Sequence, residues 1–136
     1  YRKKIIDEAG RFGCTNRVKL IGPISDADKA WYYQHCLAFA FPSIAEGFGL
    51  PVLEAMHFGK PVFLSNKTSL PEIGGNAAFY FDSFEPQAMQ QAFGNGLQEF
   101  QKNNLQRKVM DHAAEFSWDR AAAQYLQLYG ECLMEG

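Results

Sequence analysis

The stretch of residues 37–61 most constrains what this chain can fold into, because an apolar run, a loop with glycines and a helix start follow one another there. The apolar run covers residues 37–41 and stops at Pro42. A short apolar run that ends at a breaker is typical of a strand buried on both faces, and we expect this strand at the centre of a sheet. Gly47 and Gly49 lie in the loop that follows, where a missing side chain lets a ligand approach the backbone.

The helix after this loop begins without the usual side-chain cap. Pro51 stands where a first-turn proline would stand, and the helix is predicted to run to about residue 58 and to end at Gly59. The N-cap candidates Gly49 and Leu50 have no side-chain oxygen, so the first N–H groups of this helix lack the usual acceptor. Such N–H groups at the carboxyl end of a strand, together with the helix dipole, favour an anion such as phosphate.

Other predicted helix starts carry their own acceptors. Residues 69–72, SLPE, form a capping-box pattern, and Ser25 and Ser117 each precede a helical run. The missing cap is therefore a local property of the helix that begins at Pro51.

Two carboxylates flank this uncapped helix start. Glu46 precedes the glycines, and Glu54 lies about one turn inside the helix. Carboxylates beside a phosphate site favour ligand binding only if the ligand also carries hydroxyl groups, which donate hydrogen bonds to carboxylates. Glu54 suits a ribose diol and Glu46 suits a sugar, so the predicted ligand is a sugar joined to a nucleoside through a diphosphate.

The motif PSxxEGFGLPxLEAM, in which seven residues separate the two glutamates, closely resembles the signature of the retaining glycosyltransferases of family four, which have the two-domain GT-B fold. Matching segments elsewhere extend the resemblance over nearly the whole chain: residues 18–22, 59–62, 69–73 and 116–118. The resemblance implies an α/β, Rossmann-like, doubly wound and mostly parallel sheet. It identifies residues 1–136 as the C-terminal domain that binds the sugar donor.

Compared with the family pattern, the beginning of this domain is missing. The family pattern has two further strands at this point, with a loop whose Arg and Lys face the diphosphate. It also has an N-terminal domain that binds the acceptor. In the common doubly wound order those two strands lie between a strand at 18–21 and the strand at 37–41. We therefore expect a rearranged sheet or one completed by a second copy in a homodimer. We also expect the 136 residues alone to bind nucleotide weakly and to transfer no sugar.

The resemblance implies a role for each site residue. Glu54 would bind the ribose hydroxyls, and four backbone N–H groups would bind the diphosphate and the sugar: those of Gly47, Phe48, Gly49 and Leu50. The alternative for Glu54 is that an acid in the first turn of a helix stabilises the helix through its dipole. The alternative for the loop is a tight turn that needs glycine.

Two further positions are implied by the same resemblance. Glu46 is the catalytic candidate, in contact with the ring hydroxyls of the transferred sugar, and the alternative is an exposed loop acid. The backbone of Ile24 would meet the base, and the alternative is core packing. The family needs no metal and no cofactor beyond the nucleotide sugar, and no cluster of hard oxygen ligands argues otherwise.

Other side chains have chemistry but no supporting pattern. The histidines at 35, 57 and 112 are scattered and are interpreted as structural, and Ser43 has no His–acid pair, which argues against a hydrolase. Five aromatic residues are able to stack a base, although core or interface packing is the favoured interpretation: Trp31, Tyr32, Tyr33, Trp118 and Tyr125.

Composition narrows the class of protein. A net charge of −2 with mixed signs gives no footprint for nucleic acid. The widely spaced cysteines, Cys14, Cys36 and Cys132, indicate reduced thiols in a cytoplasm. No apolar run approaches the ~20 residues of a membrane span. The chain starts with Tyr1 rather than Met, so the absence of a signal peptide excludes nothing.

Strands alternate with helices along the rest of the chain, which predicts that the strands pair in parallel. The remaining strands are expected at 62–64 and 78–81, and the helices at 1–12, 25–35, 69–75, 86–100, 105–116 and 117–129.

The predicted parent enzyme moves a sugar from a UDP- or GDP-sugar to a hydroxyl with retention of anomeric configuration. On family grounds it builds bacterial O-antigen, lipopolysaccharide or another envelope polysaccharide on a lipid-linked acceptor, at the cytoplasmic face of the membrane. Two alternatives stay open: a non-catalytic nucleotide-sugar-binding module, and an enzyme similar to sucrose- or trehalose-phosphate synthases.

Overall fold

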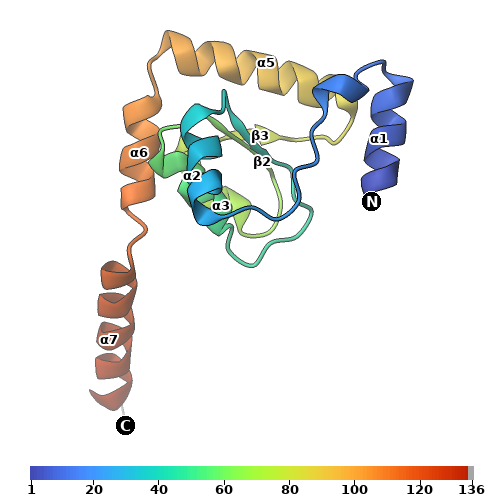
Figure 1. Cartoon of the computed structure of the whole chain (residues 1–136). Helices are drawn as coiled ribbons and strands as arrows, with labels where there is room; N and C mark the ends of the chain where they lie inside the picture. The colour runs from blue at the N-terminus through green and yellow to red at the C-terminus, as the bar shows by residue number, and fades with distance from the viewer. Residues whose placement is uncertain (135–136) are drawn as a thin grey trace. The chain divides into compact units, whose positions relative to one another are not determined.

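The computed structural model describes residues 1–134 and divides into two compact units, Tyr1–Trp31 and the chain from Tyr32 onward (Figure 1). The first unit contains α1 (Arg2–Arg11), η1 (Thr15–Arg17) and the first turns of α2 (Asp26–His35). Helix α2 is capped as predicted, because the Oγ of Ser25 accepts a hydrogen bond from the backbone N–H of Asp28 at 3.1 Å.

The strand predicted at residues 18–21 is wrong. Val18 has extended backbone angles (φ −101°, ψ 119°), but no strand within residues 1–134 pairs with this segment. Extended backbone becomes a strand only where a neighbour supplies ladder hydrogen bonds, and the expected neighbours are the two strands that the family pattern adds.

The second unit is built on a parallel sheet of β1 (Phe39–Phe41), β2 (Val62–Ser65) and β3 (Phe79–Phe81), in the order β1-β2-β3. The sequence placed residues 37–41 at the centre and buried them on both faces, and this is wrong, because β1 is an edge strand and Ala40 is exposed. Strand β2 takes the centre instead, and each of its four residues is buried.

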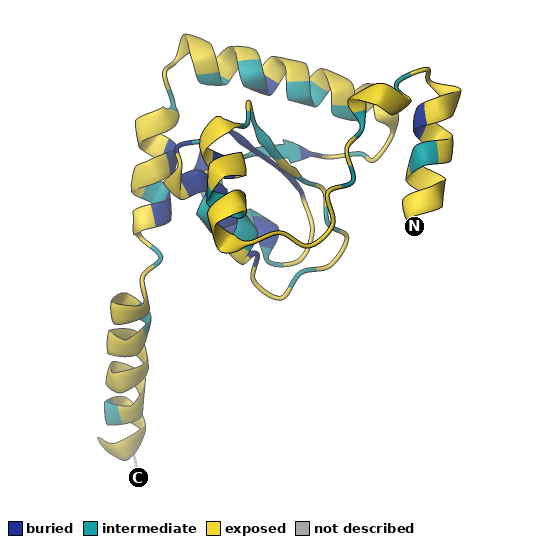
Figure 2. Cartoon of the chain, in the orientation of Figure 1, coloured by how far each residue is buried: buried dark blue, intermediate teal, exposed yellow. Residues whose placement is uncertain are grey.

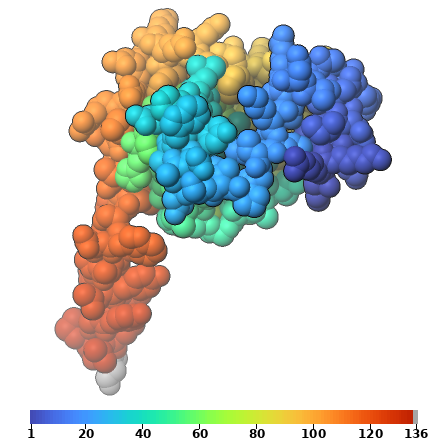
Figure 3. Space-filling view, viewed as in Figure 1, coloured from blue at the N-terminus to red at the C-terminus, as the bar shows by residue number. Residues whose placement is uncertain are grey.

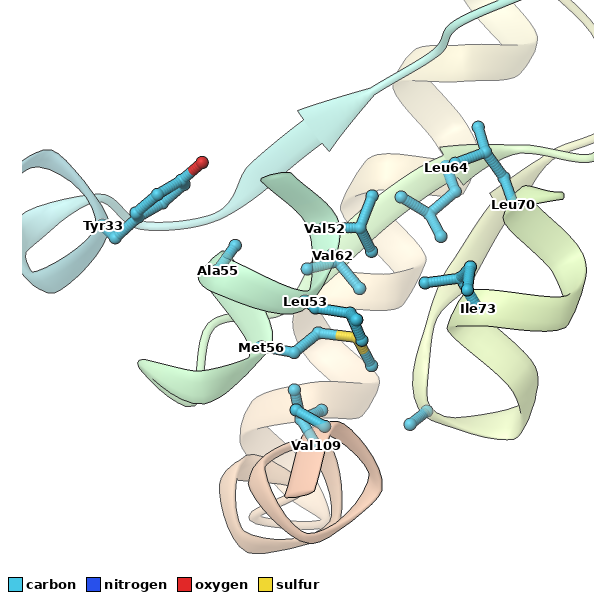
Figure 4. Packing of buried hydrophobic residues seen from close by; sticks show 12 residues of the cluster. Tyr33, Val52, Leu53, Ala55, Met56, Val62, Leu64, Leu70, Ile73 and Val109 are labelled. Atoms are coloured by element: carbon cyan, nitrogen blue, oxygen red, sulfur yellow. The ribbon is translucent and has the colours of Figure 1, made fainter. Parts of the chain in front are cut away.

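Alternation along β2 assigns its residues to opposite faces of the sheet. Val62 and Leu64 face a core that they share with three helices: α3 (Leu50–His57), α4 (Leu70–Gly74) and α6 (Gln106–Ala114). Figure 4 shows part of this packing, where Leu53 and Met56 of α3 point toward Val109 of α6.

Phe63 faces the other way and contacts Phe93 of α5 (Pro86–Lys102), with ring centroids 4.6 Å apart. Gly96 of α5 also packs here, since a Cβ at that position would lie 2.6 Å from the Phe63 ring. Helix α5 therefore covers the opposite face to α3, and the fold is the predicted doubly wound α/β arrangement.

The C-terminal helix α7 (Trp118–Met134) has no buried residue. Ser117 caps it as predicted and accepts a hydrogen bond from the N–H of Arg120 at 3.1 Å. Most residues of this helix are exposed, as Figure 2 shows, and in Figure 3 its red-orange atoms extend away from the cyan and green atoms of the second unit. The short helix η2 (Gly75–Ala77) completes the elements and links α4 to β3.

Candidate functional site

The loop between β1 and α3 meets the loop after β2, because parallel strands end at the same edge of a sheet. The Oγ1 of Thr68 accepts a hydrogen bond from the N–H of Glu46 at 3.1 Å. Ser65, which is fully buried, donates its hydroxyl to the carbonyl of Ser43. These bonds fix the beginning of the glycine loop to the end of the central strand.

Ser69 completes this attachment. Its hydroxyl lies 3.1 Å from the carbonyl oxygens of both Glu46 and Phe48. The capping box predicted for residues 69–72 is wrong, because Ser69 makes no side-chain capping bond to α4. The hydroxyl is used to hold the neighbouring loop instead, so Ser69 shapes the candidate site.

The start of α3 is uncapped, as predicted. Gly49 is the N-cap residue, with φ 107° and ψ 41°, and no side chain bonds the first turn. This left-handed conformation favours glycine because it has no Cβ. The C-terminal end also follows the prediction, since Gly59 has φ 66° and donates its N–H to the carbonyl of Met56 at 2.8 Å.

The amides of this loop have no protein acceptor. Within residues 1–134, the backbone N–H groups of Gly47, Phe48, Gly49 and Leu50 make no hydrogen bond. Gly47, Phe48 and Leu50 are exposed and Gly49 is buried. Consecutive N–H groups at a helix start form an anion-binding concavity, so the geometry is compatible with a phosphate.

Glu46 is anchored at both its backbone and its side chain. Besides the bond from its N–H to Thr68, its Oε1 accepts the hydroxyl of Ser43 at 2.8 Å. The residue is half-buried, so the carboxylate is held at the mouth of the loop while part of it meets solvent. The interpretation as a fully exposed loop acid therefore does not describe it.

Glu54 lies on α3 and is also half-buried. Its Oε2 accepts the hydroxyl of Tyr33 at 3.1 Å. Burial, and then the hydrogen bond to Glu54, raise the pKa of Tyr33 well above its usual range. The Tyr33 hydroxyl is therefore protonated well into the alkaline range and donates to the carboxylate.

Ile24 lies in the first unit, and the residues from 46 to 54 lie in the second. The residue is 41% exposed, so the core-packing alternative is wrong for it. It lies two residues after Gly22, which has φ 71°. The contact of Ile24 with a base stays a prediction.

A groove of about 630 Å³ opens between the starts of α3 and α7. Phe48 of the glycine loop contacts Phe116 edge-on across it, with ring centroids 6.4 Å apart. Apolar side chains dominate its lining, among them Leu50, Leu53, Trp118 and Tyr125.

Four of the five aromatic residues predicted to pack in the core or at an interface are exposed, so the prediction of core packing is wrong for them: Trp31, Tyr32, Trp118 and Tyr125. Interface packing stays a prediction for these four. Tyr33 is buried, as the packing interpretation expected.

His112 makes a structural contact. The Nε2 of His112 lies 2.8 Å from the carbonyl oxygen of Ile73 and joins α6 to α4. In the part of the chain that the structure describes, no three His, Cys, Asp or Glu side chains are placed to hold a metal ion. Over the same residues, no helix combines the length and apolar character needed to cross a membrane.

Sequence reasoning missed the residues that support the loop, Ser43, Ser65, Thr68 and Ser69. The available signal was the hydroxyl-rich stretch that follows the strand predicted at 62–64. At the end of a parallel strand, such side chains lie next to the neighbouring loop.

Comparison with solved structures supports the fold. Sucrose-phosphate synthase from Thermosynechococcus elongatus superposes with a TM-score of 0.75 at 24% identity, over 99% of this chain and 35% of that one. The catalytic domain of starch synthase IV from Arabidopsis thaliana, bound to ADP and acarbose, gives 0.68 at 20% identity, over 95% of this chain and 29% of that one. At these identities the likeness concerns the fold alone.

Sequence comparison finds relatives with higher identity than these two solved structures. O-antigen chain mannosyltransferase B of Escherichia coli is 34% identical over 113 residues, which are 82% of this chain and 30% of that protein. The serotype-specific mannosyltransferase WbdA of Escherichia coli is 36% identical over 88% of this chain and 15% of its own length. D-inositol 3-phosphate glycosyltransferase of Salinispora tropica is 32% identical over 96% of this chain and 28% of its own length.

The chain thus spans less than a third of each of these curated relatives. Residues 1–115, which include the whole glycine loop and α3, match the family described as glycosyl transferases group 1. The chain belongs to the glycosyl transferases group 1 family.

Proposed function

We propose that residues 1–136 form the C-terminal, sugar-donor-binding domain of a retaining family-four glycosyltransferase with the two-domain GT-B fold. One observation carries the proposal: the backbone amides of residues 47–50 have no acceptor within residues 1–134, and two half-buried acids, Glu46 and Glu54, flank these residues in the sequence. The amides suit a diphosphate, and the carboxylates suit hydroxyl groups. A nucleotide sugar offers both.

In the proposed reaction, the bond between the anomeric carbon and the diphosphate oxygen breaks, and the oxygen of an acceptor hydroxyl bonds the anomeric carbon on the same face of the sugar. The proton of that hydroxyl passes to the leaving diphosphate. The leaving diphosphate gains negative charge as this bond breaks. The fixed N–H groups of residues 47–50 stabilise that charge more than they stabilise the bound donor, which lowers the barrier.

The two carboxylates have separate parts in this proposal. Glu54 accepts hydrogen bonds from the ribose hydroxyls, and Glu46 accepts them from ring hydroxyls of the transferred sugar. Because Thr68, Ser69 and Ser43 hold the loop at Glu46, this contact is already oriented before the ligand arrives. The reaction as proposed uses no metal and no cofactor other than the UDP- or GDP-sugar.

The relatives support a place in envelope polysaccharide synthesis. An O-antigen mannosyltransferase of Escherichia coli is 34% identical to the chain. We infer a parent enzyme that works on a lipid-linked glycan at the cytoplasmic face of the membrane. The likeness to sucrose-phosphate synthase, at 24% identity, does not favour that alternative because it concerns the fold alone.

Completion of the sheet belongs to the same proposal. In the described chain β1 is the edge strand next to the glycine loop. Two preceding strands of a longer parent, or strands from a second copy in a homodimer, would pair with this edge. The acceptor-binding domain would be supplied by the parent chain, and sugar transfer would require it.

The proposal predicts that the chain binds a nucleoside diphosphate and prefers one base. Titration calorimetry with UDP, GDP and ADP, and with the three corresponding nucleosides, measures this. Each charge-assisted hydrogen bond contributes about 1.5–3 kcal/mol, so the preferred diphosphate should bind at least about tenfold more tightly than its nucleoside. Equal affinity for nucleoside and diphosphate, or no binding of any of the three diphosphates, would contradict the proposal.

A further inference from the structure

Tyr33 lies in a slot between the two elements that flank the glycine loop. Its ring contacts Phe39, the first residue of β1, edge-on with centroids 5.5 Å apart. It stacks on Phe58, which follows α3, at 5.9 Å. Only 8% of Tyr33 is exposed. The ring position is therefore fixed by packing.

The hydroxyl of Tyr33 has one specific partner. It donates to the Oε2 of Glu54 at 3.1 Å, and it links α2 to a residue 21 positions later in the chain. A buried tyrosine hydroxyl needs such a partner, whereas phenylalanine would fill the same aromatic slot without one. Packing alone therefore explains the ring of Tyr33 but does not explain its hydroxyl.

The effect of this bond falls on the orientation of the Glu54 carboxylate. The terminal torsion of a glutamate is broad, so an unsupported carboxylate rotates freely about its last bond. A donor on Oε2 restricts this rotation. A carboxylate offers about four lone-pair sites on its two oxygens, and the bond from Tyr33 occupies one of them.

We propose that Tyr33 is a positioning residue, which orients the carboxylate of Glu54 for recognition of the two ribose hydroxyls of the nucleotide. This inference rests on the proposed nucleotide-binding function. Tyr33 itself does not touch the ligand, and its contribution passes through Glu54 alone. It therefore matters only for ligands that carry the ribose diol.

The test compares Tyr33→Phe with the wild-type chain, using the tightest-binding nucleoside diphosphate and its 2′,3′-dideoxy analogue. Loss of one hydrogen bond that orients the carboxylate should weaken binding of the ribose form about three- to tenfold. Binding of the dideoxy analogue should change less than about twofold. A merely structural role would weaken both ligands equally, and that result would overturn the inference.

Tyr80→Phe is the matched control. Tyr80 is half-buried, and its hydroxyl donates to the carbonyl of Gly75 at 2.8 Å rather than to Glu54. This variant should bind both ligands like the wild type. Should it lower the affinity for the ribose form as much as Tyr33→Phe does, the effect is general loosening and the inference fails.

A double-mutant cycle tests the inference even if Tyr33→Phe lowers the stability of the fold. If Tyr33 acts through Glu54, then Tyr33→Phe combined with Glu54→Ala, which removes the acceptor of the Tyr33 hydroxyl, should bind no more weakly than Glu54→Ala alone, at a temperature where each variant is folded. Additive losses would overturn the inference. Failure of the proposed function has a different signature, because the wild-type chain itself would then bind no nucleoside diphosphate.

Discussion

Glu54→Ala is expected to lower the affinity of the chain for its preferred nucleoside diphosphate by about 100-fold. The substitution removes a carboxylate that would accept from two ribose hydroxyls, and each charge-assisted bond contributes about 1.5–3 kcal/mol. It also leaves the hydroxyl of Tyr33 without its acceptor on Oε2. Calorimetry measures the affinity, and thermal unfolding shows whether the variant is folded at the temperature used.

Glu72→Ala is the control for the change in net charge. Glu72 is exposed in the first turn of α4, and its substitution removes the same single charge. Its affinity for the nucleotide should stay within about twofold of the wild type, because an exposed charge is largely screened by solvent. If Glu54→Ala binds as tightly as Glu72→Ala, Glu54 has no part in nucleotide binding.

Gly49→Ala is expected to damage the loop through its backbone. Gly49 has φ 107°, which L residues rarely adopt, and a Cβ there would lie 3.1 Å from the Cδ2 of Leu70. Backbone strain of this kind costs about 1–3 kcal/mol. We expect the free energy of unfolding to fall by about that amount in a denaturant titration. We also expect nucleotide affinity to fall about tenfold or more as the amides of residues 47–50 shift.

Gly47→Ala separates this effect from the loss of a glycine in general. A Cβ at Gly47 would meet no atom within 4 Å, and its φ lies outside the left-handed range. Its free energy of unfolding should therefore stay within about 0.5 kcal/mol of the wild type, as for other unstrained surface changes. Equal stability of Gly49→Ala and Gly47→Ala would show that the left-handed conformation at the N-cap is not required.

The sequence predicted the start and end of α3 because both are set by local backbone chemistry. A proline in the first turn, no polar side chain at Gly49 and a left-handed Gly59 act within a few residues of one another. The same holds for the caps at Ser25 and Ser117, where the acceptor and the N–H are three residues apart.

The errors concern contacts between distant parts of the chain. Residues 37–41 and 62–64 are both short apolar runs, and nothing within either run tells which of them becomes the central strand. That depends on the order β1-β2-β3, which is a property of the whole sheet. The run at 18–21 fails as a strand for the same reason, because it has no partner within residues 1–134.

Ser69 illustrates the limit for the site. The pattern SLPE predicts a capping box, but the hydroxyl bonds the carbonyls of Glu46 and Phe48, more than 20 residues earlier. The choice between these acceptors is made by the position of the glycine loop, which the local sequence of residues 69–72 does not contain. The support of Glu54 by Tyr33 was missed on the same ground.

The backbone amides of residues 47–50 are the groups that bind the anion in the proposed site. An amide proton–nitrogen NMR titration follows these groups one by one as the tightest-binding nucleoside diphosphate is added, with its nucleoside as the reference. Large shifts at Gly47, Phe48, Gly49 and Leu50 with the diphosphate, and small ones with the nucleoside, are the predicted result. Unchanged signals from all four residues at saturating diphosphate would contradict the account.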